Sequence, residues 1–280
     1  MPAEGPGPEA VDLLLRREAL APGPEMTYAS VTMPSERNDP PLEAGSAASA
    51  LPASERVRIR RKPDRGRYDR ETIDAILDAA IVGHVGWVLD GRPYVTPTAI
   101  WRQGDRLYWH GSTGSRMVRE TRHGAPVCVT ATILDGLVLA RSGLDHSLNY
   151  RSVMVLGRAH AIEAEAEALA ALEAFFEHLY PGRWAELRPV TPQELRQTTV
   201  LWVELTESSA KIRAEGAHDE PGDETWPAWA GVIPVRLVTG VPEPEQSVPV
   251  GMPVPAHVPG PGSVVLREGR TSLPQGRWRG

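Results

Sequence analysis

Short runs of apolar and β-branched residues dominate the middle of the chain, and turn signals separate most of them. The runs predict strands over residues 84–89, 94–101, 107–110, 126–134, 137–140, 151–162 and 200–205. Asp90-Gly91, between the first two runs, is typical of a tight hairpin, and Asp135-Gly136 separates the fourth and fifth runs in the same way. This pattern predicts a mainly β fold, an antiparallel barrel with few helices, rather than a doubly wound sheet.

Two stretches carry apolar residues at helical spacing instead. Asp69 is a suitable N-cap for the first helix, whose predicted buried face is Ile73, Ile76, Leu77 and Ala80. The second helix is marked by an apolar face that consists of Leu169, Leu172, Phe176 and Leu179.

Proline divides the chain into three parts. Residues 1–55 contain nine of the 27 prolines, residues 56–240 contain ten, and residues 241–280 contain eight. The first part has a single aromatic residue, Tyr28, so we expect a disordered extension that buries little surface. Because proline donates no backbone hydrogen bond, the last part is predicted to be a mobile tail or a surface strap. The folded domain is therefore predicted at residues 56–240.

Composition narrows the classes of function. A net charge of −6 argues against a nucleic-acid-binding protein, which normally carries a basic excess. The single cysteine, Cys128, excludes an intrachain disulfide, and we interpret it as a small core residue rather than a reactive thiol. The histidines are not spaced as metal ligands, and neither a membrane span nor a signal peptide is apparent. These features favour a cytoplasmic protein without a dedicated metal site or a membrane partner.

Residues 108–116 carry the most informative chemistry, with the sequence Tyr-Trp-His-Gly-Ser-Thr-Gly-Ser-Arg. The segment leaves a predicted strand, passes two glycines and three hydroxyl residues, and ends in arginine before a predicted helix over residues 117–122. Backbone N–H groups, hydroxyls and a guanidinium are suitable donors for a phosphate monoester, and glycine lets the backbone approach it. The alternative is an ordinary polar turn, in which Ser115 caps the helix and Arg116 is solvated. No Rossmann, Walker A, HExxH, CxxC or GxSxG motif is present.

Further short motifs surround this segment. In chain order they are Tyr68-Asp69, Val82-Gly83-His84-Val85, Asp90-Gly91-Arg92-Pro93-Tyr94-Val95-Thr96-Pro97, Leu107-Tyr108-Trp109-His110-Gly111-Ser112, Pro126-Val127-Cys128-Val129-Thr130, Asp135-Gly136-Leu137-Val138-Leu139-Ala140-Arg141-Ser142, Asn149-Tyr150-Arg151-Ser152-Val153, Ala210-Lys211-Ile212-Arg213 and Trp229-Ala230-Gly231-Val232-Ile233-Pro234. By their number and order, residues 56–240 resemble the pyridoxamine 5′-phosphate oxidase-like FMN-binding split-barrel family, specifically the branch of the nitroimidazole-resistance proteins. The resemblance implies a six-stranded antiparallel split β-barrel of the FMN-binding type.

The resemblance also implies a flavin site in a groove at a homodimer interface. The residues that would line the isoalloxazine ring are Val95, Thr96, Pro97 and Thr98. Those that would hold the phosphate are Ser112, Thr113, Ser115 and Arg116. Those that would lie near the groove, in reach of the partner's flavin, are Tyr150, Arg151 and Ser152. The candidate catalytic proton donors, at the open side of the ring, are His110 and His146.

Three functions fit this picture. The first is an oxidoreductase in which FMN takes hydride from NAD(P)H and passes electrons to a small acceptor such as a nitroaromatic or a quinone. The second is a non-catalytic protein that holds flavin or haem for storage, sensing or transfer. The third keeps the barrel but uses the deazaflavin F420 in a reductase.

Several tryptophans and charges have structural interpretations. The strand tryptophans expected to supply apolar surface to a homodimer are Trp87, Trp101, Trp109 and Trp202. Trp226 and Trp229 are interpreted as packing anchors, and Lys211 and Arg213 as solvated charges on a strand.

Overall fold

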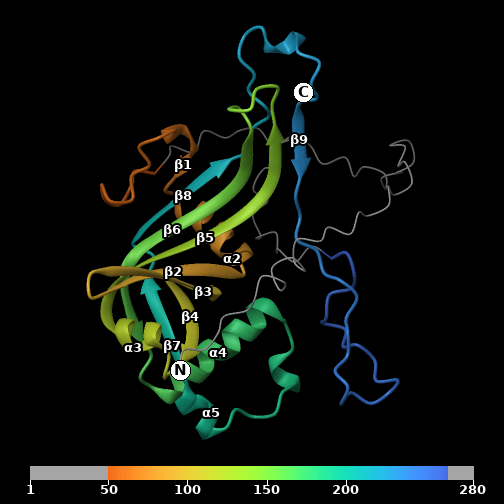
Figure 1. The fold of residues 1–280 in the computed structure, drawn as a ribbon. Helices are drawn as coiled ribbons and strands as arrows, with labels where there is room; N and C mark the ends of the chain where they lie inside the picture. The colour runs from red at the N-terminus through yellow and green to blue at the C-terminus, as the bar shows by residue number, and fades with distance from the viewer. Residues whose placement is uncertain (1–49, 264–280) are drawn as a thin grey trace, which may run out of the picture. The chain divides into compact units, whose positions relative to one another are not determined.

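The computed structural model describes residues 50–263 (Figure 1). Most of the predicted 1–55 extension and residues 264–280 of the predicted tail lie outside the described residues. The helices and single helical turns are η1 (Pro63–Arg65), α2 (Arg70–Ala79), α3 (Arg116–Thr121), α4 (Glu165–Leu179), η2 (Trp184–Glu186), α5 (Pro192–Gln197) and η3 (Asp223–Thr225). The strands are β1 (Gly66–Arg67), β2 (Val82–Leu89), β3 (Arg92–Gln103), β4 (Arg106–Ser112), β5 (His123–Leu139), β6 (Ser147–Ala161), β7 (Thr198–Glu204), β8 (Glu207–Arg213) and β9 (Gly231–Pro234).

Six of the strands close into a ring. The antiparallel pairs run from β2 through β3, β4, β7, β6 and β5 and return to β2. Fully buried side chains, among them Ile100, Trp109 and Leu201, fill the interior of the ring. Alternation along each strand directs one set of side chains inward, which is why the apolar runs predict this arrangement. The mainly β fold with a six-stranded antiparallel split barrel is therefore confirmed.

The hairpin between β2 and β3 forms as predicted. Asp90 and Gly91 have φ angles of 50° and 74°, and two left-handed residues in succession suit a two-residue turn that follows the strand twist. This turn sets Leu89 opposite Arg92 and therefore Trp87 opposite Tyr94. The hairpin thus places two large aromatic side chains on one face.

The second Asp-Gly pair does not form a turn, so the prediction of two strands over residues 126–140 is wrong. β5 runs continuously through Asp135 and Gly136, with a register shift between residues 134 and 136. The cause is the length of β6, which pairs with both runs, so that a bulge absorbs the Asp-Gly pair. Figure 1 shows the two long strands extending beyond the ring, with β8 along β6 and β9 along β5. We call this extension, residues 131–139 and 147–154, the β5–β6 ribbon.

The first predicted helix is confirmed. The second helix also forms, but the face that it buries differs from the predicted one. Asp69 caps α2 by accepting a hydrogen bond of 2.8 Å from the Thr72 backbone N–H. In α4 the buried residues are Ala168, Ala171, Leu172 and Phe175, whereas Leu169 is partly exposed. This helix packs on the outside of the ring against bulky Trp101 and Tyr108, where alanines allow a close approach.

Burial corrects several interpretations. Trp87, Trp101 and Trp109 are buried within the chain, so they do not supply exposed surface to a dimer. Trp226 and Trp229 are each 66% exposed, which does not fit packing anchors. These outcomes arise because strand alternation alone does not say which face a second layer covers.

Two polar residues were also misjudged. Arg213 is only 3% exposed, in contrast to the expected solvated charge, because its guanidinium turns to the chain itself and donates to the Asn149 side-chain oxygen on β6 and to the Glu215 carbonyl oxygen. Cys128 is half-buried rather than fully buried, and its burial raises the pKa of the thiol, which disfavours the reactive thiolate. No helix within residues 50–263 has the length and apolarity needed to span a bilayer.

Candidate functional site

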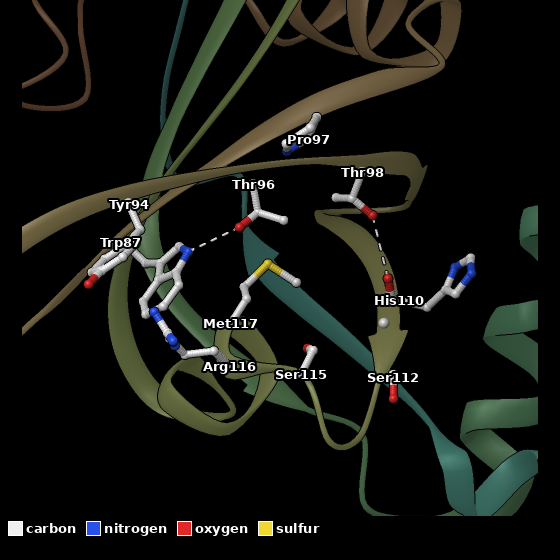
Figure 2. A pocket seen from close by; sticks show the side chains of 11 residues that line it. Trp87, Tyr94, Thr96, Pro97, Thr98, His110, Ser112, Ser115, Arg116 and Met117 are labelled. Atoms are coloured by element: carbon white, nitrogen blue, oxygen red, sulfur yellow. Dashed lines mark hydrogen bonds between the residues drawn. The ribbon is translucent and has the colours of Figure 1, made fainter. Parts of the chain in front are cut away.

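A pocket of about 520 Å³ lies where the β2–β3 hairpin, the end of β4 and the start of α3 meet. We call it the hairpin pocket. Its lining residues are Trp87, Tyr94, Thr96, Pro97, Thr98, His110, Gly111, Ser112, Ser115, Arg116 and Met117 (Figure 2). Seven of the residues proposed from the sequence therefore come together here, and they are Thr96, Pro97, Thr98, His110, Ser112, Ser115 and Arg116.

The loop after β4 forms one polar end of the hairpin pocket. The Ser115 backbone N–H donates to the Ser112 carbonyl oxygen at 2.8 Å, which closes a tight turn. The Ser115 hydroxyl accepts from the Val118 backbone N–H at 3.3 Å and so caps α3. A side chain at Gly114 would meet only the Ser112 hydroxyl oxygen, at 3.9 Å, so the loop is open above this residue. The loop therefore offers hydroxyl and backbone donors to a bound anion.

Thr113 does not belong to this polar end. Its backbone N–H donates to the Gln197 carbonyl oxygen at 2.9 Å, and its hydroxyl lies 3.0 Å from both the Arg196 carbonyl oxygen and the Thr199 hydroxyl. These contacts turn Thr113 toward α5 and β7. The predicted role of Thr113 as a phosphate ligand is not supported by this placement.

Two stacked aromatic rings form the other end of the hairpin pocket. Trp87 and Tyr94 have ring centroids 4.7 Å apart and an interplanar angle of 19°. The Trp87 indole N–H donates to the Thr96 hydroxyl at 3.2 Å, which holds the indole in place. The sequence did not indicate either aromatic residue as part of the site. The two-residue turn at Asp90-Gly91 was the available signal, because it sets Trp87 and Tyr94 opposite each other.

Arg116 extends toward these rings from the loop after β4, residues 112–115, which we call the hydroxyl loop. Figure 2 shows its side chain directed to Trp87 and away from Ser112. Its guanidinium carbon lies 5.8 Å from the centroid of the Tyr94 ring, a distance at which cation–π attraction acts. Among the described residues no carboxylate pairs with Arg116, so its charge is available to a bound anion. The Arg116 guanidinium and the hydroxyl loop thus offer two separate contacts to the anionic groups of a bound ligand.

His110 lies on the side of β4 away from Met117 (Figure 2). Its ring packs edge-on against Phe175 with centroids 5.0 Å apart, and near Trp101. The Nδ1 atom is buried without a hydrogen-bond partner among the described residues. Burial lowers the pKa of His110, because the apolar surroundings disfavour the imidazolium. A neutral imidazole at neutral pH is a hydrogen-bonding group rather than the strong proton donor expected from the sequence.

The remaining predicted residues lie outside the hairpin pocket in this chain. Val95 points outward from β3 and is exposed. Arg151 donates to the Asp135 carboxylate at 2.9 and 2.7 Å, and the Ser152 hydroxyl donates to the Lys211 carbonyl oxygen at 3.2 Å. Tyr150 stands beside them on the ribbon, opposite Arg213 of β8. Their predicted contact with a partner's flavin stays a prediction.

His146 lines a different pocket, also of about 520 Å³, beside the ribbon. We call it the ribbon pocket. Its lining residues are Arg61, Lys62, Asp64, Arg65, Leu144, Asp145, His146, Ser147, Arg213, Glu215, His218 and Glu220. Since the two pockets share no lining residue, His110 and His146 do not face one site within a single chain. No group of three or more His, Cys, Asp or Glu residues suited to a metal ion occurs within residues 50–263.

Comparisons with known proteins agree with this architecture. A profile of the family described as pyridoxamine 5′-phosphate oxidase matches residues 69–212. The solved structure of the flavocytochrome Anf3 from Azotobacter vinelandii is 42% identical, with a TM-score of 0.71, over 74% of this chain and 97% of that chain. The FAD and haem binding protein from Mycobacterium smegmatis is 35% identical, with a TM-score of 0.69, over 72% and 99% of the two chains. The search of curated proteins finds no match.

The narrower assignment to the nitroimidazole-resistance branch has weaker support. A candidate 5-nitroimidazole antibiotic resistance protein from Bacteroides thetaiotaomicron is 24% identical, with a TM-score of 0.44, over 52% of this chain and 86% of that chain. A likeness at this level does not place the chain in that branch.

Proposed function

Because this chain belongs to the pyridoxamine 5′-phosphate oxidase family, we propose that the hairpin pocket binds a flavin. The supporting observation is the combination of an open hydroxyl loop with the stacked Trp87–Tyr94 pair in one pocket. A flavin needs apolar and aromatic walls for its ring system and polar donors for its phosphate. A bound flavin supplies the redox chemistry, and the protein supplies binding, orientation and access.

FAD is the flavin that we propose, with FMN as the alternative. Arg116 lies apart from Ser112 and extends toward Tyr94. A cofactor with two phosphates would use both the hydroxyl loop and the guanidinium, whereas FMN offers only one phosphate. The Mycobacterium smegmatis relative, described as binding FAD and haem, agrees with this choice.

The cellular role that we propose is electron transfer or sensing with flavin and haem, in the manner of a flavocytochrome, rather than turnover of a dedicated substrate. The two relatives above are described as a flavocytochrome and as an FAD and haem binding protein. His110, the histidine among the residues that line the pocket, is held neutral by burial, which lowers its pKa. The expected oxidoreductase activity toward a nitroaromatic or quinone stays the second candidate, since nothing in the pocket selects such an acceptor.

We propose in addition that the protein is a homodimer, for a reason other than the buried tryptophans. Val82, Val88 and Val95 project outward from the β2–β3 hairpin and are about half exposed or more. Pro97, which lines the hairpin pocket, is also exposed on β3. An apolar outer face that borders the pocket is suited to a second copy that would complete the groove.

The absorption spectrum of the purified protein, followed by chromatography of the released cofactor, tests these proposals. We expect a flavin spectrum, release of FAD and a Soret band from haem. Release of FMN would change only the choice of flavin. Release of F420 would favour the F420-dependent reductase instead. A protein that retains no flavin after reconstitution and desalting would contradict the proposed function. Sedimentation of a monomer at micromolar concentration would contradict the dimer.

A further inference from the structure

The ribbon pocket is built from three segments that are far apart in the sequence. Residues 61–65 precede β1, residues 144–147 lead into β6, and residues 213–220 begin at the end of β8. Four cationic and four acidic side chains line the pocket, and Leu144 is the single apolar residue of the lining. With neutral histidines the formal charge of this lining is zero. Such a pocket suits neither an apolar ligand nor a polyanion.

Arg213 is the buried cation of the ribbon pocket. Among the described residues its guanidinium donates to uncharged acceptors, which are the Asn149 side-chain oxygen at 2.5 Å and the carbonyl oxygens of Glu215 and Gly216 at 3.2 and 3.1 Å. The Glu215 carboxylate lies 3.7 Å from the Arg213 Nε atom and is already bonded to Arg65 at 3.0 and 2.7 Å. Two guanidinium groups thus share one carboxylate, so an anionic group of a ligand would be favoured beside them.

Two further cations belong to the first segment. Arg61 and Lys62 line the pocket and form no ion pair within residues 50–263. Arg65 connects this segment to Arg213, because both guanidinium groups lie beside the Glu215 carboxylate. We call Arg61, Lys62 and Arg213 the cationic end of the ribbon pocket. Its ammonium and guanidinium donors suit a carboxylate.

Acceptors come from the other two segments. Asp145 and Glu220 line the pocket, and their carboxylates form no ion pair among the described residues. The His146 Nδ1 atom lies 2.9 Å from the Ser142 carbonyl oxygen. A carbonyl only accepts hydrogen bonds, so Nδ1 carries the proton and Nε2 presents its lone pair to a ligand. We call Asp145, His146 and Glu220 the acceptor end, and its groups suit an ammonium ion.

The unpaired charges of the two ends line one pocket without pairing with each other. Opposite charges that stay apart across a cavity leave room for a ligand that contacts both. The volume of about 520 Å³ accommodates a molecule between an amino acid and a short peptide in size. The ribbon pocket therefore selects by charge pattern rather than by apolar contact.

We propose that the ribbon pocket binds a small zwitterion of the amino-acid and short-peptide class, with its carboxylate at the cationic end and its ammonium group at the acceptor end. A ligand with one charge would leave the opposite end without a partner, so both charges are needed for recognition. This inference goes beyond the proposed flavin function and does not depend on it, because the two pockets share no lining residue.

Calorimetric titration of the purified full-length protein with triglycine tests the charge pattern. Its matched ligands are N-acetyltriglycine, which lacks the ammonium group, and triglycinamide, which lacks the carboxylate. We expect a Kd of about 1 mM for triglycine, in line with the size of the molecule. Each capped ligand should bind about threefold to tenfold more weakly. Equal affinity for all three ligands, or no binding of triglycine at about 10 mM, would overturn the proposal.

Two variants assign the ends of the pocket. Lys62→Asn should weaken triglycine about threefold to tenfold and leave triglycinamide unchanged, since asparagine tolerates the left-handed backbone at this position, where φ is 54°. Glu220→Gln should weaken triglycine to the same extent and leave N-acetyltriglycine unchanged. The controls are Arg92→Gln and Glu173→Gln, which change exposed charges outside the lining and should bind like the wild type.

Flavin content, read from the absorption spectrum, separates this site from the hairpin pocket. Both pocket variants should retain the flavin of the wild type, because no residue of the hairpin pocket is changed. Wild-type affinity for triglycine in both Lys62→Asn and Glu220→Gln would overturn the assignment. Triglycine binding by a wild type that holds no flavin would leave this site standing while the proposed function fails.

Discussion

The hairpin pocket and the ribbon pocket differ in the surroundings of their titratable side chains. In the hairpin pocket, apolar burial surrounds a few polar groups, and His110 has a lowered pKa with no charged partner. In the ribbon pocket, charged groups face one another, and the pKa of Glu215 falls to about 2 because Arg65 and His218 donate hydrogen bonds to it. Desolvation thus sets the direction of the pKa shift in the hairpin pocket, and hydrogen-bonded ion pairs set it in the ribbon pocket. The first suits a planar cofactor with few anionic contacts, and the second holds its shape through its own charges.

The largest effect should come from the interior of the ring. Trp109 is fully buried there, and Trp109→Ala should lower the free energy of unfolding by about 3–5 kcal/mol, because the cavity it leaves cannot collapse completely. Urea denaturation measures this change. The exposed Trp226→Ala is the control and should stay within about 0.5 kcal/mol of the wild type. Equal values for the two variants would mean that Trp109 is not a core residue.

A smaller loss of stability should follow from removal of the buried cation at the ribbon. Arg213 donates to the Asn149 side-chain oxygen at 2.5 Å and to the Gly216 carbonyl oxygen at 3.1 Å. Arg213→Met should lower the free energy of unfolding by about 2–3 kcal/mol, because these acceptors lose a charged donor. Arg61→Met, with no ion pair among the described residues, should change it little. An unaltered Arg213→Met variant would show that this cation does not stabilise the fold.

Replacement of Arg116 tests whether the hairpin pocket prefers FAD to FMN. Loss of a charge-assisted hydrogen bond costs about 1.5–3 kcal/mol, so Arg116→Ala should weaken FAD by about 10- to 100-fold. FMN should be weakened less and riboflavin not at all, as measured by fluorescence titration of the apoprotein. Arg119→Ala, on the same short helix but outside the pocket lining, is the matched control. An equal loss for all three ligands would mean that Arg116 does not contact phosphate.

The smallest effect concerns the acid limb of stability. The folded-state pKa of Glu215 is lowered from 4.5 to about 2. Its contribution to stability is therefore complete above pH 4.5 and disappears as the pH falls toward about 2, since the unfolded state then binds the proton first. Glu215→Gln should make the loss of stability over this interval shallower. Glu173→Gln on the exposed face of α4 should keep the steep limb, and identical curves for both would exclude Glu215 as a source of the pH dependence.

Local signals predicted those parts of the protein that depend on a few neighbouring residues. Asp69 predicted the start of α2, and Asp90-Gly91 predicted the hairpin, because capping and left-handed turns are satisfied within four residues of the chain. The hydroxyl and glycine spacing of residues 111–116 likewise predicted a polar loop at the end of a strand. The family resemblance then supplied the ring of six strands.

Contacts between distant segments decided the rest. Whether Asp135-Gly136 turns or continues depended on the length of β6, and whether Arg213 meets water depended on Asn149 and Glu215. The separation of His110 from His146 into two pockets and the direction of Arg116 likewise followed from packing between elements. The sequence by itself determined the capping, the turns and the strand periodicity, because their energies are local. Burial, and with it pKa and ligand access, was decided only when strands far apart in the chain came together.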